Sequence, residues 1–284
     1  MLVFGTAGIP HSAEKRNSVA GISAVRALGL DAMEVQFVQR VGMGDQTARR
    51  VRGAAEKNGV RLSAHAPYYI NLNSKDPEKM RASKERLLLA ARVAAICGAR
   101  NVVFHAAFNH DDPPAMVYEH VRAQLQTVAA QLRDEHVCVC LRPETSGKPS
   151  QFGSLDEILQ LSAEVEGIGP CIDFGHLYAR NAGAVNTYAG FEAVLTAVDD
   201  ALGAAALQDM HMHIEGMVYG RAGERKHLAF EASDLRYEEL LQALVDWDVG
   251  GTVICESPIL EQDALLLQRA YRRLTGHGAC RTTE

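Results

Sequence analysis

The stretch DPEKMRASKERLLLAARVAAICGA (residues 76–99) is followed, after one residue, by NVVFHAA (101–107). In the first part, apolar residues recur every three or four positions with charges between them, which is typical of an amphipathic helix. The second part is a short apolar and β-branched run, which is typical of a buried strand. A helix that leads directly into a strand indicates one βα unit of a parallel sheet.

The same alternation continues along the whole chain. Seven further strand candidates are LVFG (2–5), AMEVQF (32–37), RLSAHAP (61–67), VCVCLRPE (137–144), PCIDFGH (170–176), LQDMHMHI (207–214) and GTVICES (251–257). Eight units in 284 residues are about 35 residues each, the size expected of a closed barrel. We therefore predict an α/β fold, a single (β/α)8 TIM barrel over residues 1–276 with a C-terminal tail at 277–284. Two long connections, ARNAGAVNTY (179–188) and residues 215–234, are expected to be functional loops.

Composition narrows the class of protein. With 47% hydrophobic and 23% charged residues, the chain is an ordinary globular protein and not a disordered one. A net charge of −6 argues against a broadly basic nucleic-acid surface, although a local positive rim would not show in the total. The six cysteines contain no Cys-x-x-Cys pair and are interpreted as core residues. The sequence has no signal-peptide pattern or long apolar run, so we expect a cytoplasmic protein without a membrane partner. We also expect a monomer.

Ligand-type side chains stand at or near the ends of six consecutive predicted strands. They are His65, His105, Glu144, Asp173, His211 and Glu256. Their separations of 40, 39, 29, 38 and 45 residues are each about one βα unit. Equivalent positions on successive strands converge at the C-terminal mouth of a barrel, where such enzymes carry their active sites. The spacing therefore predicts a metal site at that mouth.

Three imidazoles, three carboxylates and no thiolate suit Zn²⁺ or Mn²⁺. Crowded carboxylates without a cation would repel one another, whereas divalent ions would hold them ionised. Glu144 is central in the chain order, and a carboxylate can bridge two ions about 3.5 to 4 Å apart. We therefore expect Glu144 to be the bridging, catalytic residue.

Six short motifs surround these residues. They are SAHAPYYINL (63–72), VVFHAA (102–107), PETSG (143–147), CIDFGHLYA (171–179), MHMH (210–213) and ICESP (254–258). In order and strand position they resemble the endonuclease IV family of apurinic/apyrimidinic endonucleases, in the xylose-isomerase-like barrel superfamily. The resemblance runs from about residue 3 to residue 275. It implies a barrel that holds three zinc ions and hydrolyses the phosphodiester 5′ to an abasic site in double-stranded DNA, during DNA repair.

Carried over by motif, the resemblance implies three ligand sets. They are His65, His105 and Glu144 for the first ion; Glu144, Asp173, His211 and Glu256 for the second; and His176 with a pair from the loop after strand seven for the third. The family has an Asp-x-His pair in that loop, whereas this chain has GERKHL (223–228). One alignment selects Glu224 and Lys226, and a one-residue shift selects Arg225 and His227. A two-zinc enzyme, and a third ion held by His176, His227 and Glu224, therefore both stay open.

Three residues are expected to contact the DNA. Tyr68 and Tyr69 stand three and four residues after His65. They would fill the gap left by the missing base, with loop packing as the alternative. Arg40, after strand two, would contact a DNA phosphate or insert into the DNA double helix. The alternative is a solvated arginine on the protein surface.

Two further interpretations concern the barrel interior. Arg142 shares a strand face with Glu144, and because a buried arginine needs a partner we expect it to pair with Glu34. His213 shares a face with His211, and we expect a core or supporting role for it.

Two other functions compete with the nuclease. A sugar isomerase or epimerase of the same superfamily would need one divalent ion, with glutamates that move protons beside a carbonyl. His65 and His105 weigh against it, because they would be ligands of a second ion. The third candidate is a metal-holding barrel without enzymatic activity, since a barrel fold alone does not prove a reaction.

Overall fold

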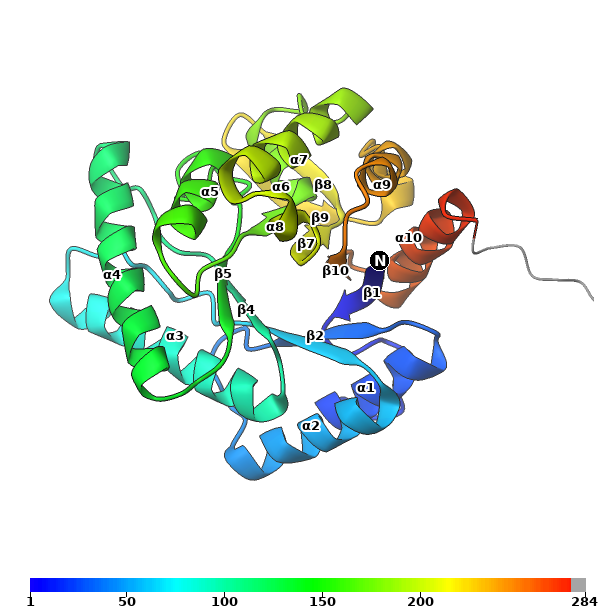
Figure 1. Cartoon of the computed structure of the whole chain (residues 1–284), viewed down its shortest axis with the longest axis horizontal. Helices are drawn as coiled ribbons and strands as arrows, with labels where there is room; N and C mark the ends of the chain where they lie inside the picture. Colours follow the sequence, from blue (N-terminus) through cyan, green and yellow to red (C-terminus); the bar gives the residue numbers. More distant parts are fainter. Residues whose placement is uncertain (277–284) are drawn as a thin grey trace, which may run out of the picture.

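Eight short strands run parallel around one axis in the computed structural model of the chain, which describes residues 1–276 (Figure 1). They are β1 (Leu2–Ala7), β2 (Ala32–Gln36), β3 (Arg61–His65), β4 (Asn101–Phe104), β5 (Cys140–Pro143), β6 (Cys171–Asp173), β7 (Met210–Ile214) and β10 (Gly251–Cys255). Their order in the sheet is β5-β4-β3-β2-β1-β10-β7-β6. The predicted (β/α)8 barrel is therefore confirmed. The expected tail, residues 277–284, lies outside the residues that the structure describes.

Helices surround the sheet and connect its strands (Figure 1). They are α1 (Ser18–Ala27), α2 (Asp45–Asn58), α3 (Pro77–Cys97), α4 (Pro114–Asp134), α5 (Leu155–Glu164), α6 (Phe174–Arg180), α7 (Tyr188–Leu202), α8 (Ala204–Leu207), α9 (Tyr237–Asp246) and α10 (Glu261–Leu274). Helix α3 shows how the sequence sets their limits. The Asp76 side chain accepts hydrogen bonds from the first free backbone N–H groups, and Gly98, with φ of 78°, ends the helix in the left-handed region. No helix within residues 1–276 is long and apolar enough to cross a membrane.

The barrel closes between β5 and β6, the two strands at the ends of the sheet order. Isolated parallel bridges join Leu141 to Ile168 and Glu144 to Cys171. The backbone N–H of Thr145 donates to the Cys171 carbonyl at 3.0 Å, and its hydroxyl accepts from the backbone N–H of Asp173 at 2.8 Å. Because these strands have only four and three residues, the Thr145 side chain supplies part of the closure, next to two of the predicted ligands.

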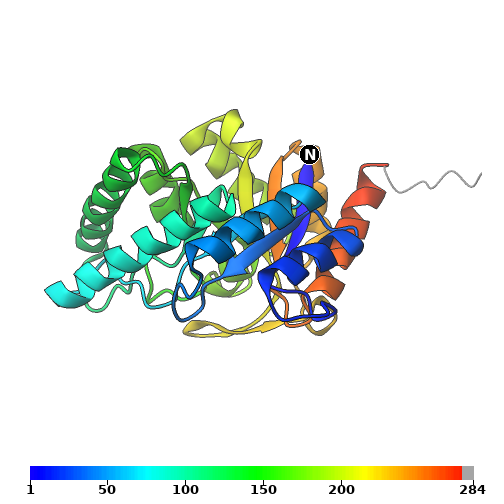
Figure 2. The same cartoon turned by 90° about the horizontal axis from the view of Figure 1, so that it is seen from below.

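The connection after β7, expected to be a loop, forms an antiparallel hairpin. Its strands are β8 (Gly216–Gly220) and β9 (Gly223–Leu228), followed by a short 3-10 helix, Phe230–Ala232. In Figure 2 this hairpin, in yellow, lies at the opposite end of the barrel from the N-terminus. It therefore covers the mouth toward which the carboxyl ends of the parallel strands point.

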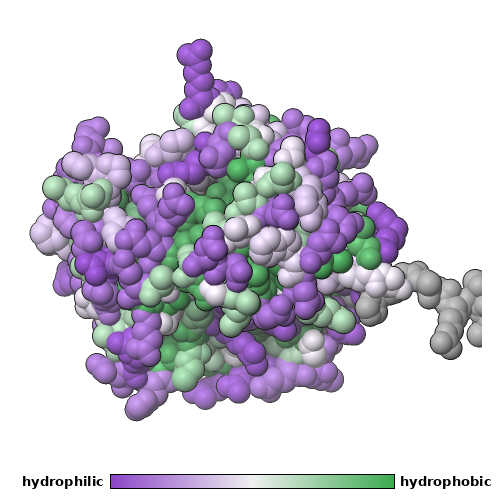
Figure 3. Space-filling view, turned by 45° about the horizontal axis from the view of Figure 1, so that its top comes forward, coloured by the Kyte–Doolittle hydropathy of each residue, from purple (hydrophilic) through white to green (hydrophobic). Residues whose placement is uncertain are grey.

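Polar side chains fill much of the barrel interior. Buried members of this group are Glu34, Ser63, Asn101, Arg142 and His211. Buried polar groups are costly unless they are hydrogen-bonded, and these side chains bond mainly to one another and to backbone carbonyls. Apolar packing is concentrated between the sheet and the helices. On the outside, hydrophilic residues cover most of the face in Figure 3, and hydrophobic residues show mainly in the hollows between them.

Candidate metal centre

The first ligand group joins the ends of three neighbouring strands. His65 is the last residue of β3, while His105 and Glu144 directly follow β4 and β5. The Nε2 atoms of His65 and His105 lie 3.3 and 3.4 Å from Oε2 of Glu144. One ligand atom from each residue falls within 4.8 Å of the other two. The structure thus brings together the three residues of the first predicted set.

The second group shares Glu144 with the first. It consists of Glu144, Asp173, His213 and Glu256. Nδ1 of His213 lies 3.0 Å from Oε1 of Glu144 and 3.4 Å from Oε1 of Glu256. Glu144 therefore turns one oxygen toward His65 and His105 and the other toward His213, as a carboxylate that bridges two ions would.

The structure places His213, and not the expected His211, in this group. Asp173 of β6 is the register partner of His213 on β7, whereas His211 pairs with Cys171, two residues deeper in the barrel. Both ring nitrogens of His211 are engaged there. Asn101 donates to Nδ1 at 3.3 Å, and Nε2 donates to Glu34 at 3.0 Å. Burial lowers the pKa of His211, so a neutral ring with no free nitrogen remains.

The third group lies between helix α6 and the hairpin. It consists of His176, Glu224 and His227. His176 lies in the first turn of α6 and not at a strand end, because β6 stops at Asp173, whose side chain accepts the backbone N–H of His176 and caps the helix. Nε2 of His176 is 3.5 Å from Oε2 of Glu224.

A β-bulge explains why Glu224 and His227 share a face although they are three residues apart. Alternate residues of a regular strand share a face, so a spacing of three would separate them. In the hairpin, Val218 pairs with Lys226 and Tyr219 pairs with Glu224, which leaves Arg225 as the extra residue. The structure thus takes Glu224 from one of the two alignments and His227 from the other.

Four of the histidines are oriented by a hydrogen bond from one ring nitrogen. Nδ1 donates to a backbone carbonyl in His65 (Ala66, 2.8 Å), His176 (Thr145, 2.9 Å) and His227 (Glu256, 3.2 Å). In His213 the other nitrogen, Nε2, lies 3.2 Å from Oε1 of Glu34. Such an outer partner fixes the tautomer and leaves the second nitrogen free to bind a cation. Oδ2 of Asp173 is buried and has no hydrogen-bond partner among residues 1–276, which also suits a cation ligand.

Without a cation, protons balance the charges in these groups. Burial lowers the pKa of His65, but the hydrogen bond and charge of Glu144 outweigh it and raise the pKa to about 9. Burial lowers the pKa of His176 too, but the charges of Asp173 and Glu144 outweigh it and raise the pKa to about 9. Burial lowers the pKa of His105 to about 4. A divalent ion must therefore displace protons from His65 and His176 when it binds.

Arg142 does not pair with Glu34 as expected. It donates instead to the side chain of Asn101 at 3.0 Å, and to the backbone carbonyl and the carboxylate of Asp209 at 3.1 and 3.2 Å. Glu34 accepts from Ser63 at 2.8 Å and faces His211 and His213. Arg142 thus supports the base of the barrel, and Glu34 supports His213.

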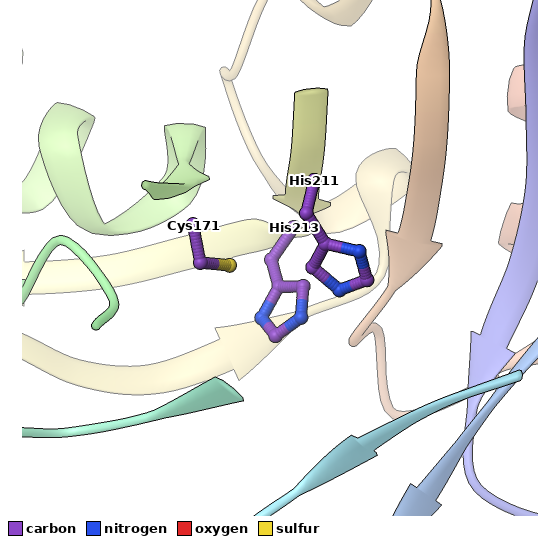
Figure 4. A group of neighbouring side chains, drawn as sticks. All are labelled: Cys171, His211 and His213. Carbon is purple, nitrogen blue, oxygen red and sulfur yellow. The ribbon is translucent and has the colours of Figure 1, made fainter. Parts of the chain in front are cut away.

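Cys171 lies beside the two histidines of β7, and its side chain points toward their rings in Figure 4. Burial raises the pKa of its thiol, so the sulfur stays protonated and packs as a small apolar group. Among the other cysteines expected in the core, Cys97 and Cys255 are buried, whereas Cys138 is exposed. Cys280 lies outside the described residues.

Glu215 is a buried carboxylate that the sequence reasoning missed. It directly follows β7, and one of its oxygens lies within 4.8 Å of ligand atoms of Asp173 and His176. Burial and the neighbouring charge of Asp173 raise its pKa well above the ordinary value. The other carboxylates were predicted because each is an acidic residue at the end of an apolar strand. Glu215 has the same position after β7 and could have been found in the same way.

A cavity of about 270 Å³ opens onto the ligand groups. Besides ligands it is lined by Tyr68, Ile70, Ala107, Phe108, Lys148 and Gln151. Tyr68 stacks beside His105, with ring centroids 6.3 Å apart and planes at 23°. Tyr69 is 63% exposed and does not line the cavity. Arg40 lines a different cavity, of about 550 Å³, together with Arg16 and Glu34.

Comparisons with known proteins agree with this fold. The chain matches the family described as "Xylose isomerase-like TIM barrel" over residues 22–274. It is 43% identical over 274 residues to the uncharacterized protein MJ0133 of Methanocaldococcus jannaschii, covering 96% of this chain and 98% of that one. It is 27% identical over 245 residues to a probable endonuclease 4 of Halorhodospira halophila, covering 84% and 81%.

Solved structures are similar as well. Endonuclease IV from Thermus thermophilus matches with a TM-score of 0.72 at 21% identity, covering 96% of this chain and 99% of that chain. D-psicose 3-epimerase from Clostridium cellulolyticum matches with a TM-score of 0.63 at 15% identity, covering 96% and 98%. At these identities the two likenesses show the fold alone.

Proposed function

Because the chain belongs to the xylose isomerase-like TIM barrel family, we propose that its mouth is the active site of a zinc-dependent endonuclease. The substrate is double-stranded DNA with an abasic site, and the phosphodiester 5′ to that site is hydrolysed. The observation that carries the proposal is the sharing of Glu144 between two groups of potential metal ligands, one of three residues and one of four, beside a third group at the hairpin. Relatives named probable endonuclease 4 support it.

The residues present fit three divalent cations. His65, His105 and Glu144 would hold one; Glu144, Asp173, His213 and Glu256 a second; and His176, Glu224 and His227 a third. Nitrogen and oxygen donors without thiolate suit Zn²⁺, with Mn²⁺ as the other candidate. When bound, such ions lower the pKa of water and neutralise charge on the phosphate.

The protein's own groups would position the DNA. Glu144 orients the attacking water between the first two groups, and the buried Glu34 keeps Nδ1 of His213 directed at the mouth. Tyr68, which is 52% exposed and lines the cavity, would fill the space of the missing base. Lys148 in the cavity, with Arg221 at the exposed turn of the hairpin, would meet phosphates in spite of the negative net charge.

A one-ion epimerase is the second candidate, because the second group alone offers four ligands, two of them glutamates. Acid–base glutamates on either side of a sugar carbonyl would perform that reaction. The first and third groups have no role in it.

The decisive experiment compares two substrates. Purified protein is incubated with a DNA duplex carrying one tetrahydrofuran abasic analogue, with and without chelator, and in parallel with a ketohexose. We expect one nick 5′ to the analogue that chelator abolishes, and no change in the sugar. Epimerisation of the ketohexose, together with a duplex that stays uncleaved, would overturn the proposal in favour of the second candidate.

A further inference from the structure

Glu215 stands between the second and third ligand groups. Its side chain is 0% exposed, and both carboxylate oxygens lack a hydrogen-bond partner among residues 1–276. One ligand atom of each of Glu215, Asp173 and His176 falls within 4.8 Å of the others. Oδ2 of Asp173, which accepts no hydrogen bond among the same residues but lies 3.3 Å from Nδ1 of His176, belongs to the same cluster.

The chain makes room for this carboxylate with a glycine. A Cβ at Gly175 would lie 1.9 Å from Oε1 and 2.8 Å from Cδ of Glu215. Any other residue at position 175 would therefore displace the side chain. The first turn of α6 thus holds His176 for a cation and leaves space beside it for Glu215.

A buried carboxylate without hydrogen bonds is strongly destabilising unless a proton or a bound cation neutralises it. Glu215 faces a second carboxylate, Asp173, which increases that cost. A divalent cation at this point would neutralise both carboxylates and occupy the unbonded oxygens of Glu215. The third group, with two imidazoles and the carboxylate of Glu224, has only one negative charge for a divalent ion.

We propose that Glu215 is a further carboxylate ligand, which connects the cation held at Asp173 with the cation held at His176. The inference rests on the proposed metal cluster and adds to it a ligand from the end of β7. Because the added donor is oxygen, it shifts the third group toward harder ions such as Mn²⁺. It also makes the affinities of the two sites interdependent.

The test is Glu215→Gln, a change of charge with nearly unchanged shape. The matched control is Glu261→Gln, because Glu261 is also buried but accepts backbone N–H bonds from His11 at 2.9 Å and Ser12 at 2.8 Å, away from the cluster. For both variants and wild type, Zn²⁺ and Mn²⁺ per chain are measured after dialysis. Melting temperature is measured with and without chelator.

We expect Glu215→Gln to weaken binding of at least one ion by about tenfold or more, since even outer-shell changes cost about 10- to 100-fold. It should also raise the melting temperature of the chelated protein while lowering that of the loaded protein. Glu261→Gln should change both states in the same direction. This inference alone would be overturned if wild type binds its ions but Glu215→Gln keeps the same ion count and shows no opposite shifts in melting temperature with and without chelator. Wild type without bound ions would overturn the proposed function as well.

Discussion

Asp173 and His213 are register partners on β6 and β7, so they stand at the same height in the barrel wall. His211 shares their face but lies two residues deeper, about 6.6 Å along the strand. In the proposed metal centre, this relationship makes His213 a ligand and His211 a supporting residue, although both are buried histidines of one strand.

The two histidines should therefore respond differently to substitution. His213→Ala removes a ligand, so we expect loss of one ion per chain and a fall in cleavage of at least about 100-fold. His211→Ala removes a partner of Glu34 and should lower the melting temperature while the ion count stays unchanged. Elemental analysis of both variants is the measurement. Loss of an ion only in His211→Ala would reverse our assignment.

Glu144→Gln should nearly abolish cleavage of the abasic duplex with little loss of fold. The amide keeps the shape but removes the charge that two groups share, and we expect a fall in kcat of at least about 100-fold. Circular dichroism serves as the control for folding. Full activity in this variant would contradict the bridging role.

The stabilisation that bound metal confers should increase with pH. In the cation-free protein the folded-state pKa values of His65 and His176 are raised from 6.5 to about 9. Their protonated forms therefore stabilise the fold below about pH 6.5, and this contribution is lost as the pH rises through about 9. A cation displaces the same protons, so the metal-induced rise in melting temperature should grow from pH 6.5 to 9. An equal rise at every pH would contradict the linkage.

The tyrosine pair should divide into one DNA contact and one surface residue. Tyr68 lines the cavity and stacks beside His105, so Tyr68→Ala should raise KM for the abasic duplex by about tenfold. Tyr69 does not line the cavity, and its backbone carbonyl, which accepts from Arg86 at 2.9 Å, remains in Tyr69→Ala. Steady-state cleavage by both variants is the measurement, and equal effects would show that the cavity does not select between them.

The fold was predictable because each βα unit repeats a local pattern, and strand ends at that period locate His65, His105, Glu144 and Asp173. The register of β7 was not predictable, because a shift of two residues keeps the same face inward. Neither was the bulge at Arg225, since an inserted residue leaves no sign in hydrophobic spacing. The hairpin was not predictable either, because its sequence, EGMVYGRAGERKHL (215–228), is too polar and glycine-rich to suggest strands.

The proposed metal centre lies at the seam between β5 and β6, so bound metal should also stabilise the closure of the barrel. Glu144 and Asp173 stand on either side of this seam, where short strands leave the wall with few ladder bonds. An ion held by both would act as a cross-link across the weakest part of the wall. The amide hydrogens of Leu141 and Thr145 bond across the seam. Chelation should therefore increase their exchange rate with solvent more than that of the amides of β1 and β10, which pair over five residues on the far side of the barrel.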